Sequence, residues 1–124
     1  MLIEQHYPWL ADYLLSKKGM TMDYKEEWEW HRFLLRDKMV AAFCGEKSDR
    51  PLFTVKCEPD FNDFLRQTYP DIIEGYYMNK VHWNSVIIGG GVPDEVVREM
   101  CDRAYALILG SLPKKVQKEI EQQG

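Results

Sequence analysis

The spacing of apolar residues changes at about position 22, and this change constrains the fold more than any other feature. Between Met22 and Cys57 the spacing follows a period of two, which is typical of strands with one buried face. Phe33 and Leu35 share one side of such a strand, and residues 39–44 are apolar throughout, as in a central strand. Because short turns join these segments, we expect an antiparallel meander of three or four strands.

Polar stretches mark the limits of these strands. Asp37 and Lys38 predict a tight reversal, and residues 45–51 (GEKSDRP) form the clearest loop. A strand is predicted over 52–57. Another is predicted over 81–88, after a loop that includes residues 71–80 and before three consecutive glycines. The spacing of those glycines matches neither common phosphate-binding pattern, so we interpret them as a strand-to-helix connection.

A period of three to four predicts helices on both sides of the strands. Leu10 and Leu14 share one face of an N-terminal helix that ends at Gly19. Pro8 fits best within the first turn of that helix, which leaves its start open. Further helices are predicted to begin near Pro59, Pro93 and Ser111. Strands that cluster in the sequence, with helices around them, indicate an α+β fold. We therefore predict an antiparallel sheet, a hairpin meander, packed with three to four helices.

Length and charge limit the class of protein. The 124 residues fit one domain, so we treat 1–124 as a single unit. Sixteen basic and twenty acidic side chains give a net charge of −4, opposite to the balance usual in proteins that coat nucleic acid. No apolar stretch approaches the roughly 20 residues that span a bilayer, and the first residues lack the pattern of a secretory signal. We expect a cytoplasmic monomer that does not associate with membranes.

Metal binding and nucleophilic catalysis find little support. The three histidines lie far apart, without a second ligand at metal-binding spacing. The three cysteines form no C-x-x-C pair and lie in apolar settings, which predicts buried, reduced thiols (Cys44, Cys57 and Cys101). No nucleophile motif occurs, whereas acid–base chemistry by Asp or Glu stays open. We therefore predict no metal and no cofactor, and we favour a protein without enzymatic activity.

Residues 75–86 (GYYMNKVHWNSV) have the most unusual chemistry of the chain. Strand alternation leaves neither side of this segment purely apolar, which is uncommon in a core strand. One interpretation is a recognition surface with a cation, two amides and stacking rings. Its candidate binding residues are Tyr76, Asn79, Lys80, His82, Trp83 and Asn84. In the alternative, Trp83 closes the core while His82 and the asparagines satisfy backbone groups.

The same segment resembles the signature of the MmcQ/YjbR-like family of small bacterial proteins, in the pattern Gly-Tyr-x-Met-Asn-Lys-x-His-Trp-Asn-Ser-Val. The resemblance extends from about Leu10 to about Lys115. It includes Lys38-Met39, Val55-Lys56-Cys57 and Leu112-Pro113-Lys114-Lys115. It implies an α+β domain in an arrangement called a double wing. The family has been suggested to bind DNA by fold analogy, and no enzymatic activity is established for it.

The resemblance assigns no role to the residues that match. These are Gly75, Tyr76, Met78, Asn79, Lys80, His82, Trp83 and Asn84. The chain also departs from the family where Asp23-Tyr24 runs into Lys25-Glu26-Glu27-Trp28. The added acids would make that predicted hairpin a poorer partner for phosphate.

Two functions from different classes follow, beside a purely architectural role. The first is a DNA-binding module that uses hairpin wings and basic residues. Its contacts would come from Lys80, Lys114 and Lys115, with Arg32, Arg36 and Lys38 of the hairpin. The second is a pocket around the GYYMNKVHWN segment for a small molecule or peptide, which includes the case of an enzyme with an unassigned activity. This pocket would be partly apolar and would hold His82 and Trp83.

Overall fold

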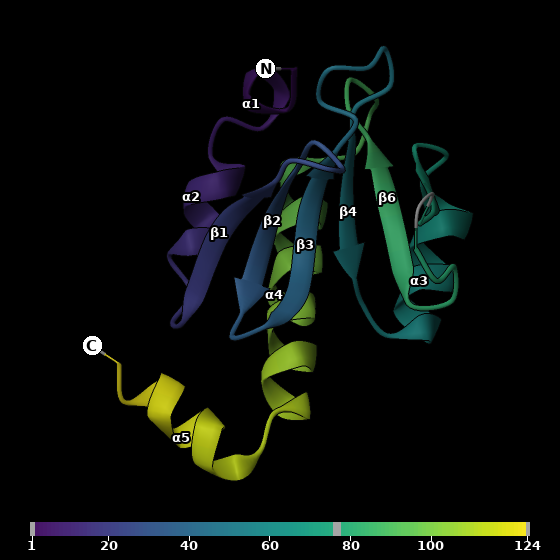
Figure 1. Cartoon of the computed structure of the whole chain (residues 1–124). Helices are drawn as coiled ribbons and strands as arrows, with labels where there is room; N and C mark the ends of the chain where they lie inside the picture. Colours follow the sequence, from purple (N-terminus) through teal and green to yellow (C-terminus); the bar gives the residue numbers. More distant parts are fainter. Residues whose placement is uncertain (1, 76–77, 124) are drawn as a thin grey trace.

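The computed structural model describes residues 2–75 and 78–123, and an antiparallel six-stranded sheet forms its centre (Figure 1). The strands are β1 (Met20–Lys25), β2 (Trp30–Leu35), β3 (Lys38–Cys44), β4 (Leu52–Lys56), β5 (Ile72–Glu74) and β6 (Trp83–Ile87). They lie in the order β1-β2-β3-β4-β6-β5. The helices are α1 (Leu2–His6), α2 (Leu10–Leu15), α3 (Pro59–Thr68), α4 (Asp94–Ser111) and α5 (Lys114–Glu121). The predicted α+β class with an antiparallel meander is confirmed.

The two faces of the sheet are covered differently. In Figure 1, α4 runs behind the sheet, and no helix crosses the front of β2, β3 and β4. The larger core cluster lies between the sheet and α4. Its members include Phe33, Phe43 and Phe53 from the strands and Val97, Met100, Ala104 and Ile108 from α4. A smaller cluster on the other face consists of Trp30, Ala42, Cys44 and Leu52, with Met39, Ile73, Met78 and Ile87 packed against it.

Several predicted boundaries differ from the structure. The last helix, predicted to begin near Ser111, begins at Lys114, because Ser111 is still part of α4. The N-terminal helix is divided into α1 and α2 by a turn that contains Pro8, so five helices are described instead of three to four. The β2–β3 turn consists of Arg36 and Asp37, because Leu35 pairs with Lys38. The backbone at Arg36 is left-handed, with φ of 58°. Residues 72–74, predicted as loop, form the short edge strand β5.

The strand predicted from residue 81 begins only at Trp83, because Asn79 redirects the backbone before it. The Oδ1 atom of Asn79 accepts hydrogen bonds from the backbone N–H groups of Val81 (2.9 Å) and His82 (3.3 Å). The carbonyl oxygen of Asn79 accepts a third from Trp83 N (3.0 Å). An asparagine side chain that binds nearby N–H groups competes with strand pairing for the same donors. Asn79 therefore forms a turn that delivers the chain to β6.

Candidate functional site

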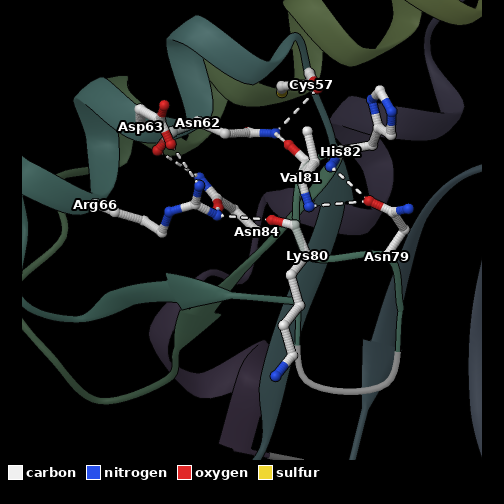
Figure 2. A network of polar contacts seen from close by, with 9 residues as sticks. All are labelled: Cys57, Asn62, Asp63, Arg66, Asn79, Lys80, Val81, His82 and Asn84. Atoms are coloured by element: carbon white, nitrogen blue, oxygen red, sulfur yellow. Dashed lines mark hydrogen bonds and ion pairs between the residues drawn. The ribbon is translucent and has the colours of Figure 1, made fainter.

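A buried polar network joins α3 to the start of β6 (Figure 2). The side chain of Asn62 is buried, and its Nδ2 donates to the carbonyl oxygens of Cys57 (3.0 Å) and Val81 (3.1 Å). Asn84 Nδ2 donates to Asn62 O (3.2 Å), while Arg66 Nη1 donates to Asn84 Oδ1 (2.8 Å). Both ends of the Asn84 amide are thus bonded within the protein, and its exposed fraction is 0%.

The same arginine also holds the loop before β6. Arg66 Nη1 donates to the carbonyl oxygen of Lys80 (3.0 Å), and Arg66 Nη2 pairs with Asp63 Oδ1 at 2.6 Å on the same helix. Figure 2 shows the Lys80 side chain extending away from this network, and the side chain is exposed. The backbone of Lys80 is therefore anchored while its ammonium group stays accessible.

Gly75 is needed where the loop meets β6. A Cβ atom built on Gly75 would lie 2.6 Å from Trp83 Cβ and 3.1 Å from Trp83 O, which is too close for any side chain. Gly75 N also donates to Trp83 O at 2.8 Å. The close approach of the backbone at position 75 to Trp83 explains why the first residue of the GYYMNKVHWNSV segment is a glycine.

A surface cavity of about 570 Å³ opens where β3 begins and β4 ends; we call it the sheet-end pocket. Its apolar lining consists of Met39, Pro59, Met78, Trp83, Leu107 and Ile108. Its polar lining consists of Lys38, Lys56, Glu58, His82 and Ser111. His82 is exposed, whereas Trp83 is only 7% exposed. The two candidates that the sequence placed in a pocket therefore lie in the wall of one.

Strand pairing explains how these side chains meet. Lys56, at the end of β4, is the cross-strand partner of Trp83, at the start of β6. Side chains of directly paired residues project from the same face of a sheet, so the lysine and the indole are neighbours in the pocket wall. Lys38 opens β3, and its Nζ donates to Ser111 Oγ of α4 at 3.2 Å. The last turns of α4 supply the remaining apolar wall.

The charges in this wall are largely uncompensated. Within the described part of the chain, Lys38, Lys56 and Glu58 take part in no ion pair. Two ammonium groups therefore face one carboxylate, and His82 adds an imidazole. A wall with apolar side chains, aromatic carbon and excess positive charge is suited to an apolar molecule that carries an anionic group.

Comparison with known proteins gives the chain a family. The family model of YjbR matches residues 15–107. The chain belongs to the YjbR family. It is 26% identical over 113 residues to YjbR of Escherichia coli K12, which covers 91% of this chain and 95% of that protein. Over 70 residues it is 33% identical to YbdF of Escherichia coli O157:H7, covering 56% of this chain and 57% of the relative. Both relatives are described as uncharacterized.

Solved structures share the fold. A crystal structure of a DUF419-domain protein from Deinococcus radiodurans superposes with a TM-score of 0.80 at 26% identity, covering 90% of this chain and 85% of that one. A Pseudomonas syringae protein superposes with a TM-score of 0.64 at 23% identity, covering 77% and 92%. The second likeness concerns the fold alone. The YjbR-like α+β architecture is thus shared.

Three described sequence candidates in this YjbR-family chain, Lys80, Lys114 and Lys115, do not line the pocket. Lys114 and Lys115 begin α5 and are exposed, and neither has an ion pair among the residues described. Figure 1 places α5 at the lower left, away from α3 and the loop that carries Lys80. The three lysines therefore do not form one continuous basic patch. Tyr76 lies outside the described residues.

The cysteines of this YjbR-family member lie in the interior as free thiols, as predicted. Burial raises the pKa of Cys44 and that of Cys57 to about 12, and it raises the pKa of Cys101 further still. Because the thiolate is the reactive form, these cysteines are poor nucleophiles at neutral pH. No group of three or more His, Cys, Asp or Glu side chains within residues 2–75 and 78–123 is arranged to hold a metal ion. In the same ranges, no helix has both the length and the apolar character needed to cross a bilayer.

A second cavity, of about 390 Å³, is lined by Glu46, which pairs with His31 in a contact that sequence reasoning missed. His31 Nδ1 lies 2.8 and 3.0 Å from the two carboxylate oxygens of Glu46, whose side chain is only 5% exposed. Glu46 lines this cavity with Trp28 and Trp30, whose ring centroids lie 5.0 Å apart. The two residues of the pair come from β2 and from the loop after β3, so only the fold brings them together.

Proposed function

We propose that this YjbR-family chain binds a small molecule in the sheet-end pocket. The supporting observation is that His82 and Trp83, from the chemically most unusual segment, line one cavity with the thioethers of Met39 and Met78. Its volume of about 570 Å³ falls within the range of roughly 300–1,000 Å³ typical of ligand pockets. Methionine side chains adapt their shape, which suits a wall that closes on a ligand.

Methionine methyl NMR tests this proposal, because the pocket contains its own reporters. A fragment library is titrated into protein labelled with ¹³C at the methionine methyl groups. Compounds that bind the pocket shift the signals of Met39 and Met78 and leave Met22 unchanged, because Met22 lies exposed on β1. They also raise the midpoint of thermal unfolding. If no compound shifts Met39 or Met78, or if Met22 shifts equally, the proposal is wrong.

A His82→Ala variant asks whether this residue contacts the ligand. His82 is exposed, so the variant is expected to fold normally. Compounds that contact the imidazole bind it more weakly, with smaller shifts at Met78. A folded variant that retains every ligand-induced shift would remove His82 from the proposed contact set.

A second candidate function is DNA binding through Lys80, Lys114 and Lys115. It is favoured by the exposure of all three lysines, each without an ion pair among the described residues. It is disfavoured by the net charge of −4. If a labelled duplex binds, affinity falls steeply with salt, and replacing both Lys114 and Lys115 by alanine reduces the slope by about 1 per lost phosphate contact. Absence of binding at low salt excludes this candidate.

A further inference from the structure

We propose that the ligand of the sheet-end pocket is an acid: a carboxylate or sulfonate attached to an aromatic or branched apolar body, with its anionic group bound by Lys56. This inference rests on the proposed small-molecule function and narrows it to one chemical class. Its evidence is the position of Lys56, the balance of charge in the wall and the nature of the apolar lining.

Lys56 occupies the position best suited to bind an anion. It is half-buried at the end of β4, and it has no ion pair within the described residues. Its cross-strand partner is the indole of Trp83, against which its aliphatic stem can lie while the ammonium group stays at the pocket. A half-buried lysine without a counter-ion interacts more strongly with an incoming anion than a fully exposed lysine does.

The rest of the polar lining favours the same sign of charge. Lys38 already donates to Ser111 Oγ at 3.2 Å, but an ammonium group has three donors and can also bind a ligand oxygen. Glu58 is the single carboxylate among the described lining residues, so a cationic ligand would meet two ammonium groups for one carboxylate. A neutral ligand would bury Lys56 further without a partner, which costs free energy.

The apolar lining defines the other part of the ligand. Met39 and Met78 supply polarizable sulfur, and Trp83 supplies an aromatic surface, while Leu107 closes the wall from α4. Sulfur and ring surfaces make favourable contacts with aromatic groups. In the proposed complex the acid group contacts Lys56, and the apolar body contacts the thioethers, the indole of Trp83 and Leu107.

Matched acid and amide pairs test this directly, because they differ in charge and hardly in shape. The probes are phenylacetate, 4-phenylbutyrate and 4-methylpentanoate, each compared with its primary amide. Binding is followed by the methyl signals of Met39 and Met78, with Met22 as the control outside the pocket. We expect at least one acid to bind about tenfold more tightly than its amide, the ratio that one charge-assisted hydrogen bond supplies.

Three variants assign the charge effect to one residue. Lys56→Met is expected to weaken acid binding about tenfold and to leave amide binding unchanged, whereas Lys56→Arg retains most of the acid affinity. Lys114→Met removes an exposed lysine from α5 and is expected to change neither. If Lys56→Met and Lys114→Met weaken acid binding equally, the effect reflects overall charge and the assignment to Lys56 is wrong.

The outcomes separate this inference from the proposed function. If acids and amides bind equally and both shift Met39 and Met78, the pocket binds small molecules but the acid class is wrong. If no probe shifts these methyl groups while other fragments do, the acid class is again wrong. If no compound of any charge shifts them, the proposed function fails as well. Whether the pocket prefers acids is decided by the affinities of the wild-type protein for each acid and its amide, so this result does not depend on the folding of a Lys56 variant.

Discussion

The segment of residues 78–84 faces α3 on one side and the sheet-end pocket on the other, and the two sides differ in what their polar groups contact. Toward α3, both ends of the buried Asn84 amide and the Nδ2 group of Asn62 are hydrogen-bonded within the protein, whereas the buried Asn62 Oδ1 has no hydrogen-bond partner among the described residues. Toward the pocket, the side chains of Lys56 and His82 line an open cavity, and neither the ammonium group nor the imidazole makes a hydrogen bond or ion pair to another described side chain. Buried and paired polar groups maintain a fold, whereas accessible and unpaired ones are available to a ligand.

The largest loss of stability is expected for Trp83→Ala, because the Trp83 ring is part of the protein interior and also of the pocket wall. The ring is buried and also forms part of the pocket wall. Its removal should lower the free energy of unfolding by about 3–5 kcal/mol, the usual cost of truncating a buried aromatic ring. Urea denaturation monitored by far-UV circular dichroism measures this loss.

Trp83→Phe is the matched control, because it keeps an aromatic ring at the same position. It should recover most of the stability lost in the alanine variant. A Trp83→Ala protein as stable as wild type would mean that the ring belongs to the ligand site alone.

The sequence alone predicts the strands of the meander better than it predicts the elements around β6. Residues of β2, β3 and β4 carry their own signal, because alternation or a continuous apolar run follows directly from burial. The strand β5 has only three residues and owes its conformation to pairing with β6. The start of β6 is displaced because Asn79 binds the N–H groups of Val81 and His82. Local propensity contains neither of these tertiary and side-chain effects.

The candidate site is only partly visible in the sequence for a related reason. The segment that contains His82 and Trp83 stands out by composition, and both residues do line the pocket. Lys56 resembles an ordinary polar residue at the end of a strand, and Leu107 an ordinary residue of an amphipathic helix. Their shared location follows from the β4–β6 pairing and from the packing of α4, which have no local signature. The pair of His31 and Glu46 was missed for the same reason.

Asn84→Ala tests the α3 side of the comparison. The variant removes the hydrogen bonds that Asn84 makes with Arg66 Nη1 and with the carbonyl oxygen of Asn62, while Arg66 Nη1 keeps its bond to Lys80 O. Because an unsatisfied buried group costs about 1–3 kcal/mol, we expect a loss of about 2–3 kcal/mol in the free energy of unfolding. Ligand shifts at Met39 should persist in the folded protein, which NMR of the labelled methionines measures.

Asn84→Asp retains an acceptor for Arg66 but replaces the donor to Asn62 O by a carboxylate oxygen, which faces that carbonyl oxygen without a hydrogen bond. We expect its stability to lie between those of Asn84→Ala and wild type. Equal stability of all three proteins would show that the network does not maintain this part of the fold.

Asn79→Ala should lower the free energy of unfolding by less than Asn84→Ala, because the turn that Asn79 stabilises is at the surface. The variant removes one acceptor oxygen that binds the N–H groups of Val81 and His82. By analogy with the loss of a helix N-cap, we expect a loss of about 1 kcal/mol. Chemical denaturation measures it, and Asn79→Asp should be close to wild type because it keeps the acceptor. A loss above about 3 kcal/mol would place Asn79 among the buried network residues.

Lys56→Met should have the smallest effect on stability, within about 0.5 kcal/mol of wild type, as for most surface substitutions. The ammonium group of Lys56 has no ion pair with any residue that the structure describes, so the substitution breaks no such ion pair. A methionine side chain preserves the apolar stem at the position paired with Trp83 and removes the charge. Urea denaturation and titration with an acid, performed on the same sample, measure stability and ligand binding separately.

The variants of Asn84 on the α3 side are expected to lose stability and to keep ligand binding. Lys56→Met is expected to keep stability and to lose the preference for acids. A loss above about 1.5 kcal/mol would instead assign Lys56 to the architecture.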